Sequence, residues 1–146
     1  MILKISLCVF AYLLGSIPCG LLIAKIFNLG DPRAFASGNI GASNMTRLGG
    51  KKIGLFTLLG DLIKGLIPSL GALFFFPGDA EILALAGFLA VLGHCFSIYL
   101  RFQGGKGVAT YVGVLLAFNP LAALLWAMAW LATFLARRIT SLAALV

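Results

Sequence analysis

A short stretch in the second half of the chain, Gly104-Gly105-Lys106-Gly107, places three glycines around one lysine directly before an apolar run. Glycines let backbone N–H groups approach a ligand, and a helix beginning at Val108 would direct its positive end at the same point. We therefore predict a phosphate site in which Lys106 supplies the full charge. The Gly-x4-Gly-Lys-Ser/Thr spacing of a nucleotide-binding P-loop is missing. A tight basic turn between helices is the alternative.

A longer polar segment, residues 31–52, is dense in glycine, serine, asparagine and threonine. Its hydroxyls and amides supply hydrogen-bond donors, and Arg47 suits a bidentate hold on phosphate. We predict a ligand site that uses Ser37, Asn39 and Arg47. A flexible basic loop that only sets topology is the alternative. For Lys51-Lys52 that alternative is favoured, although paired lysines at a membrane edge also suit anionic headgroups.

Three further ionisable residues lie within apolar runs. Asp61 and Lys64 are three residues apart, so they share one face of a helix. Such groups are costly inside a membrane, and we favour a mutually neutralising pair that fixes helix packing over an active-site role. His94 is the only histidine and could act as a general base. A structural or interfacial role is favoured, because the acyltransferase pattern His-x4-Asp has Tyr99 in place of the aspartate.

The usual tools of covalent catalysis are missing from the sequence. One histidine and four acidic residues do not assemble a Ser-His-Asp or Cys-His set. The three cysteines lack metal-ligand spacing, and nothing indicates a metal or an organic cofactor. The available groups are donors and cations aimed at phosphate. They suit a substrate that is already activated, with catalysis by positioning and charge stabilisation.

The composition predicts the elements that must position these residues. Of 146 residues, 62% are hydrophobic and 10% are charged, against about 45–50% and about 25% in soluble domains. We therefore predict an all-α integral membrane protein, with residues 1–146 forming a single transmembrane helical domain. Gly15 and Pro18 predict a kink in the first segment, and Asn119-Pro120 divides the last apolar region. The expected membrane segments are about 5–27, 53–76, 81–100, 108–118 and 121–136, and the fourth is short for a full span.

The charges predict the orientation. The chain has 11 Lys and Arg against four Asp and Glu, a net charge of +7. Nucleic-acid binding is not expected, because the charges lie between apolar runs, as topology signals do. Basic segments at 25–52, 101–106 and 137–138 alternate with non-basic ones at 77–81 and 119–120, with Lys4 as the exception. We predict an external N-terminus and cytoplasmic glycine-rich loops.

These motifs resemble those of the bacterial membrane acyl-phosphate:glycerol-3-phosphate acyltransferase family. The matching stretches are GSIPCG (15–20), SGNIGASN (37–44), RLGGKKIG (47–54), DLIKG (61–65), GH-F-S (93–97) and FQGGKGVAT (102–110). The resemblance implies transfer of a fatty acyl group from acyl phosphate to the 1-hydroxyl of glycerol 3-phosphate, giving lysophosphatidic acid and phosphate. It also implies a multi-pass protein among the lipids of the bacterial inner membrane, with its active face in the cytoplasm.

The combined expectation assigns roles to residues of both loops. Those expected to be catalytic are Ser37, Asn39, Arg47 and Lys106. Those expected to bind substrate phosphate are Gly38, Asn44, Gly104, Gly105 and Gly107. Those expected to give support are Asp61, Lys64 and His94.

Two departures from the family pattern bear on these expectations. Ala36 occupies a position where the family usually has glycine, so a positive φ there would strain the loop. The family's third cytoplasmic motif and further membrane segments would lie beyond residue 146, and Leu142–Val146 resembles the start of another apolar run. We therefore expect a C-terminally truncated chain. The alternatives are an inactive remnant or non-catalytic binding protein, and a small transporter of a phosphorylated solute.

Overall fold

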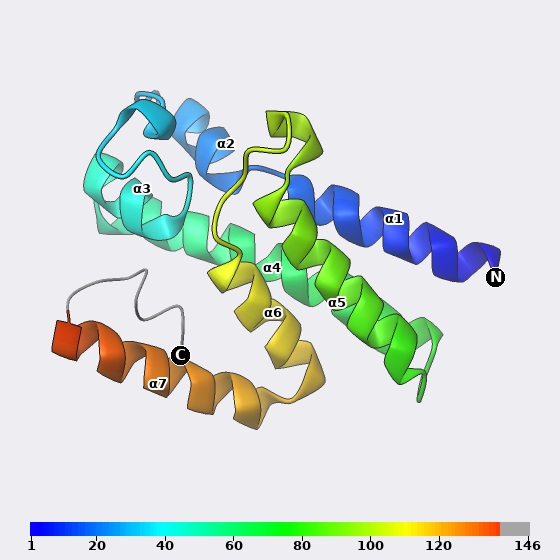
Figure 1. Cartoon of the computed structure of the whole chain (residues 1–146). Coiled ribbons are helices and arrows are strands. Elements are labelled where there is room, and N and C mark those ends of the chain that lie inside the picture. The colour runs from blue at the N-terminus through cyan, green and yellow to red at the C-terminus, as the bar shows by residue number, and fades with distance from the viewer. Residues whose placement is uncertain (138–146) are drawn as a thin grey trace.

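The computed structural model describes residues 1–137, and the regular elements in that range are all helices, as the sequence predicted (Figure 1). The α-helices are α1 (Ile2–Ser16), α2 (Cys19–Ile26), α3 (Ala42–Gly49), α4 (Lys51–Phe75), α5 (Ala80–Cys95), α6 (Val108–Phe118) and α7 (Pro120–Arg137). Two short 3-10 turns accompany them, η1 (Pro32–Ala34) and η2 (Ile98–Leu100). The expectations for Arg138 and for Leu142–Val146 lie outside the described residues.

The helices fall at the positions of the five expected apolar segments, and within residues 1–137 up to three of these segments are long and apolar enough to cross a membrane. By length and composition, Lys51–Phe75 and Ala80–Leu100 can each cross a membrane. α1 and α2 pass the same test together, and they bend by 47° at a break that contains Pro18, close to the predicted kink. α6 and α7 are shorter apolar helices. With 11 residues, α6 is only about 16 Å long against a hydrocarbon core of about 30 Å.

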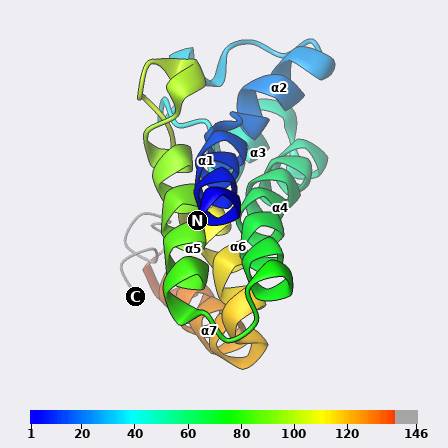
Figure 2. The same ribbon diagram turned by 90° about the vertical axis from the view of Figure 1, so that its right-hand side faces the viewer.

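α4 is the central helix of the bundle. It packs against α1, α3, α5 and α6, while α1 also packs along α5. Figure 2 shows α1 in front, with α5 on one side, α4 on the other and α6 behind. α7 packs against α6 and runs back toward the end of the molecule where α3 lies (Figure 1).

Glycines let the helices cross closely. A Cβ added at Gly15 in α1 would lie 2.1 Å from the carbonyl oxygen of Ala90 in α5, and one added at Gly93 would lie 2.3 Å from that of Tyr12. At the crossing of α4 and α6, a Cβ on Gly113 would lie 2.0 Å from the carbonyl oxygen of Leu62. Small residues at helix contacts are typical of membrane bundles, where close backbone packing replaces the hydrophobic effect.

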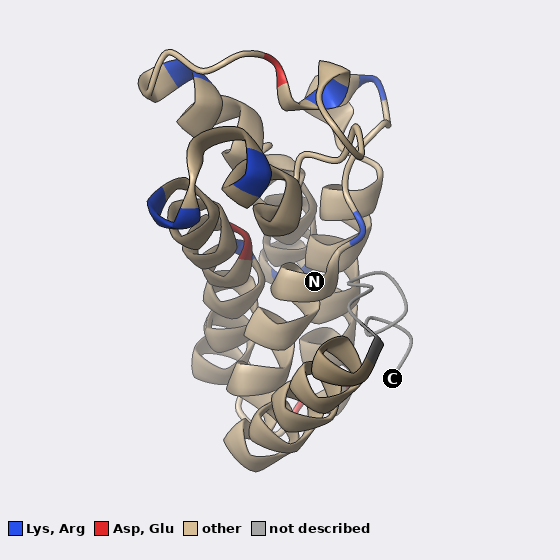
Figure 3. Ribbon diagram, turned by 90° about the vertical axis from the view of Figure 1, so that its left-hand side faces the viewer, with Lys and Arg blue, Asp and Glu red and all other residues tan. Residues whose placement is uncertain are grey.

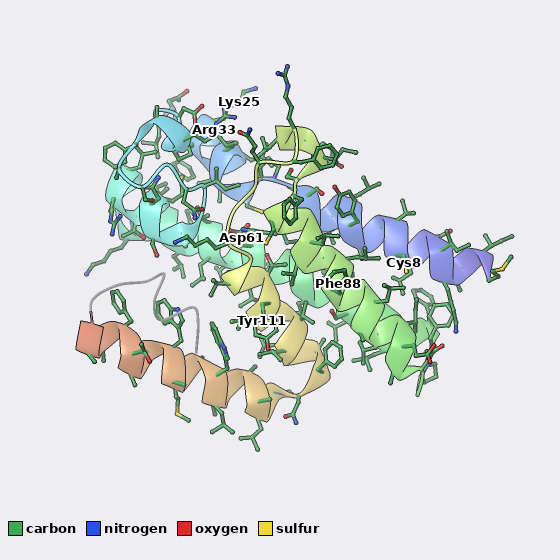
Figure 4. All side chains as sticks on the ribbon, viewed as in Figure 1. Cys8, Lys25, Arg33, Asp61, Phe88 and Tyr111 are labelled. Carbon is green, nitrogen blue, oxygen red and sulfur yellow. The ribbon has the colours of Figure 1, made fainter. Side chains whose placement is uncertain are left out.

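The two ends of the bundle differ in charge, and its sides are apolar. Figure 3 looks at the end formed by α2, α3 and the loops, where most of the lysine and arginine segments gather. At the opposite end Lys4 pairs with Asp79, which explains the one exception to the charge pattern. The hydrogen bond that the Lys4 ammonium donates to Asp79, together with its positive charge, holds the pKa of the Asp79 carboxyl below its usual value. Between the ends, large apolar side chains such as Phe88, which is 61% exposed, point outward as lipid contacts require (Figure 4).

Candidate functional site

The first polar loop is folded around the side chain of Asn44, which is fully buried. The Asn44 amide nitrogen donates to the carbonyl oxygens of Pro32 at 2.8 Å, Asn39 at 2.8 Å and Phe35 at 3.1 Å. Its oxygen accepts from the backbone N–H of Ser37 at 3.3 Å. Asn44 thus fixes the path of residues 32–39, and its hydrogen-bonding groups are used within the loop.

Two other side chains of this loop also have local partners. The Asn39 side-chain oxygen accepts from the Gly41 N–H at 2.9 Å, so its NH2 group is the part left to meet a ligand. The Arg33 guanidinium binds Asp31 at 2.6 Å, and these hydrogen bonds lower the pKa of the Asp31 carboxyl. Arg33 is therefore engaged by its neighbour Asp31.

The second glycine-rich loop lies against the C-terminal end of α5. The N–H groups of Gly104 and Gly105 donate to the carbonyl oxygens of Cys95 and His94, each at 3.0 Å. A Cβ on Gly104 would lie 1.9 Å from the His94 carbonyl oxygen, and one on Gly105 would lie 2.2 Å from His94 Nε2. These two glycines are therefore needed for close packing. Gly107, with φ +77°, turns the chain into α6.

The two loops meet at one cavity of about 720 Å³. The N-terminal ends of two helices line it, α3 through Ala42 and Ser43 and α6 through Val108 and Ala109. The first N–H groups of a helix lack partners within the helix and carry its positive dipole end, so they attract anions. Arg47 and Lys106 line the same cavity. Two helix ends and two cations therefore favour phosphate at this point.

A buried polar cluster forms the floor of this cavity, and Figure 4 labels Asp61 where α4 passes the start of α6. Asp61 Oδ1 lies 2.9 Å from Lys64 Nζ and 3.5 Å from His94 Nδ1. The Nδ1 atom of His94 also lies 3.1 Å from Thr110 Oγ1. Lys64 Nζ in turn donates to the carbonyl oxygen of Ile17 at the α1–α2 break, at 2.8 Å. The favoured interpretation of a neutralising pair agrees with this geometry, and Asp61 and His94 also line the cavity.

The remaining wall of the cavity is apolar. It is lined by side chains of α4, α6 and α7: Leu55, Leu58, Leu62, Val112, Trp126 and Trp130. Trp126 packs edge-on against Tyr111, with ring centroids 5.8 Å apart. A site with a cationic end and an apolar wall suits a ligand that has both a phosphate and a hydrocarbon part.

The cavity contains many of the residues predicted from the sequence. Those that line it are Ser37, Asn39, Arg47, Asp61, His94, Lys106 and Gly107. Among residues 1–137, the other predicted site residues lie outside this lining: Gly38, Asn44, Lys64, Gly104 and Gly105.

Sequence reasoning missed the apolar wall and two hydroxyl residues of the lining, Ser43 and Thr46. The sequence did contain a signal for this wall, because three leucines are spaced so that they share one face of α4: Leu55, Leu58 and Leu62. In a membrane protein, however, a leucine stripe can equally face lipid. Only the position of α7 shows that this face lines a cavity.

The fold and the cavity define the class of this protein. It is a helical integral membrane protein whose site joins anion-binding loops to an apolar wall. Residues 5–146 match the family model described as glycerol-3-phosphate acyltransferase, and the chain belongs to that family. The assignment that the motifs suggested is confirmed.

Named relatives and solved structures agree with this membership. A glycerol-3-phosphate acyltransferase of Pseudomonas syringae pv. syringae is 53% identical over 137 residues, which cover 94% of this chain and 71% of the relative. One from Pseudomonas aeruginosa (strain LESB58) is 51% identical over 140 residues, covering 96% and 74%. The crystal structure of PlsY (YgiH), an integral membrane glycerol 3-phosphate acyltransferase, in its glycerol 3-phosphate form matches with a TM-score of 0.91 and 45% identity, covering 97% of this chain and 70% of that one. Its lysophosphatidic acid form matches with a TM-score of 0.89.

Proposed function

We propose that this chain transfers a fatty acyl group from acyl phosphate to the 1-hydroxyl of glycerol 3-phosphate. The observation that carries the proposal is the single cavity in which Arg47, Lys106 and two helix N-termini face the same space as an apolar wall. Both substrates carry phosphate, and one of them also carries a hydrocarbon tail. The cationic end and the apolar wall therefore match the two parts of the acyl donor.

The residues of the cavity divide into roles that follow from their chemistry. Arg47 and Lys106 hold the two phosphates, because guanidinium and ammonium groups form the strongest hydrogen bonds to phosphate among the side chains of the lining. The hydroxyl of Ser37 and the free NH2 group of Asn39 donate to phosphate or carbonyl oxygens. Asn44, Gly104 and Gly105 act indirectly, since their polar groups hold the loops in shape.

The reaction needs no protein nucleophile. The glycerol oxygen attacks the acyl carbonyl carbon, the bond from that carbon to the phosphate oxygen breaks, and inorganic phosphate leaves. The leaving phosphate accepts the hydroxyl proton, so atoms and charges balance. The protein contributes by aligning two anionic substrates and by placing cations where negative charge develops.

Purified protein in detergent, supplied with acyl phosphate and glycerol 3-phosphate, tests the proposal by release of phosphate and formation of lysophosphatidic acid. Lys106→Ala is expected to lower kcat/KM for glycerol 3-phosphate by roughly a hundredfold, since one charged hydrogen-bond donor to its phosphate is lost. Lys52→Ala is the matched control, because Lys52 is an exposed lysine in the first turn of α4. The control should keep the wild-type rate.

A wild-type protein that binds glycerol 3-phosphate but forms no lysophosphatidic acid would contradict the proposal and favour a non-catalytic binding protein. The transport alternative makes a separate prediction. Reconstituted vesicles would accumulate glycerol 3-phosphate without any acyl donor.

We also propose that the cavity opens to the cytoplasm at the bacterial inner membrane. The support is the gathering of lysine and arginine at the end of the bundle that holds the site (Figure 3). Lys51→Cys should react with a membrane-impermeant thiol reagent in inside-out vesicles and not in intact spheroplasts. Wild-type protein, with three cysteines of its own, gives the background. Equal reaction from outside would reverse the orientation.

A further inference from the structure

The buried cluster around His94 connects the floor of the cavity to the loop that carries Lys106. The His94 ring contacts Asp61 on α4 and Thr110 on α6 through Nδ1. The His94 carbonyl oxygen accepts the hydrogen bond from Gly105, the residue directly before Lys106. His94 thus forms hydrogen bonds with residues on both sides of Lys106 in the sequence. One joins its carbonyl oxygen to Gly105 in the loop, and the other joins its ring to Thr110 in the first turn of α6.

The partners of Nδ1 favour one of the two possible proton positions on the His94 ring. The Asp61 carboxylate only accepts hydrogen bonds, so a proton on Nδ1 is favoured over a lone pair facing Asp61 Oδ1 at 3.5 Å. The N–H of Nδ1 then points at Thr110 Oγ1 and Asp61 Oδ1. Lys64 Nζ, 2.9 Å from the same carboxylate oxygen, holds the Asp61 side chain in place. The ring is therefore fixed by a charged partner and a hydroxyl on two different helices.

The ring occupies the space on which the loop rests. A Cβ on Gly105 would lie 2.2 Å from His94 Nε2, so Gly105 packs directly on the ring edge. The side chains of Asp61 and His94 are each only 4% exposed, and Thr110 is fully buried. A rotation of the ring would therefore move the Gly104–Gly107 loop.

We infer that Asp61 and Thr110 are positioning residues that act through His94 to hold Lys106 for the phosphate of glycerol 3-phosphate. This inference rests on the proposed function, because it assigns Lys106 to that substrate. Neither residue needs to touch the substrate for this role. Losing their hold on the ring should weaken binding of glycerol 3-phosphate more than it slows the chemical step.

Thr110→Val tests the inference, because valine keeps the shape of threonine and removes the hydroxyl. We expect the KM for glycerol 3-phosphate to rise roughly three- to tenfold, as loss of one buried hydrogen bond predicts. The KM for acyl phosphate and the kcat at saturating substrate should stay unchanged. Thr110→Ser, which restores the hydroxyl, should restore the KM. Asp61→Asn should also raise the KM for glycerol 3-phosphate, and because it leaves Lys64 without its counter-charge it is compared, as folded protein, with the charge-neutral Asp61→Asn/Lys64→Met.

Thr57→Val is the matched control. Thr57 is fully buried in α4, and its hydroxyl donates to the Ile53 carbonyl oxygen of its own helix at 2.9 Å. The control removes an equivalent hydroxyl and should leave the KM for glycerol 3-phosphate at the wild-type value. An equal rise of the KM in Thr57→Val and Thr110→Val would overturn the inference, since it would indicate only a general loss of packing. A loss of kcat at constant KM in Thr110→Val would also overturn it.

A second measurement separates this inference from the proposed function. Glycerol 3-phosphate should raise the unfolding temperature of the wild-type protein, and the rise should need a higher concentration in Thr110→Val than in Thr57→Val. If the wild type shows this protection but no acyl transfer, the proposed reaction fails while the inference stands. If acyl transfer proceeds and the two variants respond equally to glycerol 3-phosphate, the inference fails alone.

Discussion

Gly65 in α4 and Thr110 in α6 lie so close that a Cβ added to Gly65 would come within 2.1 Å of the Thr110 carbonyl oxygen. The backbones of the two helices are thus in direct contact at this point. Gly113 makes the reciprocal approach to the Leu62 carbonyl oxygen one turn further along α6. The separation of α4 from α6 therefore depends on these glycines, and with it the distance from Thr110 to His94.

Gly65→Ala should separate α4 from α6, because a rigid backbone oxygen cannot give way to the new methyl group. We expect a loss of roughly 1–3 kcal/mol, measured as lower thermal stability in detergent. Gly71→Ala in the same helix is the control. Its Cβ would meet only the end of Leu7 at 3.5 Å, an ordinary contact. A Gly65→Ala protein as stable as Gly71→Ala would contradict the assignment of this crossing.

Lys64→Met should destabilise the protein strongly. It removes the counter-charge that lies 2.9 Å from Asp61 and leaves a carboxylate, only 4% exposed, without its cation. Breaking one side of a buried pair costs roughly 3–5 kcal/mol. Chemical or thermal unfolding in detergent measures the loss.

The double variant Asp61→Asn/Lys64→Met provides the check on that explanation. It removes both charges, so it should recover a large part of the stability lost in Lys64→Met. A double variant as unstable as the single one would show that the contact of Lys64 with the Ile17 carbonyl oxygen, at 2.8 Å, is the more important one.

The sequence predicted the helices well because each one is marked by simple physical signals. The division of the last apolar region at Asn119-Pro120 matches the boundary between α6 and α7, since proline favours the first turn of a helix. The break before Cys19 follows from Pro18, which cannot continue the hydrogen-bond ladder of α1. The small helix α3 was not predicted. It is polar and only eight residues long, so hydropathy does not mark it, although its apolar residues Met45 and Leu48 pack on one face and were an overlooked periodic signal.

The sequence predicted which cationic side chains line the candidate site, but it did not predict what the backbone N–H groups of the second loop bind. Charge and glycine content indicated an anion-binding role for Arg47 in the first loop and for Lys106 in the second, and the structure places both residues in the lining of one cavity. The glycines were expected to present N–H groups to phosphate, yet those of Gly104 and Gly105 bind carbonyl oxygens of α5. Spacing along the chain cannot show this, because it depends on where α5 ends relative to the loop.

Ala36→Gly should stabilise the first loop. Ala36 has a φ of +46°, so the strain expected from its place in the motif is present. A left-handed conformation costs a non-glycine residue roughly 1–2 kcal/mol, and glycine removes this strain. Part of the gain in stability is lost again, because glycine makes the unfolded chain more flexible. We expect slower proteolysis of residues 31–41 in the variant. Ala34→Gly, two residues earlier in the 3-10 turn η1, is the control and should make the loop easier to cleave.

Leu58→Trp should shorten the apolar part of the cavity. Leu58 lines it, together with Trp126 and Trp130 of α7. A bulkier side chain takes the space of the last methylenes of a long acyl chain, and each methylene left in water costs about 0.8 kcal/mol, or roughly fourfold in affinity. The KM for long-chain acyl phosphate should therefore rise by about tenfold or more, and short-chain donors should be little affected.

Leu59→Trp separates this effect from a general disturbance of α4. Leu59 is the next residue of the helix and is 44% exposed on its apolar surface, outside the cavity lining of the described residues. Its tryptophan would meet lipid, so the preference for chain length should stay that of the wild type. If both variants shift the preference equally, or neither does, the acyl chain does not lie along α4. The cavity would then hold only the phosphate ends of the substrates.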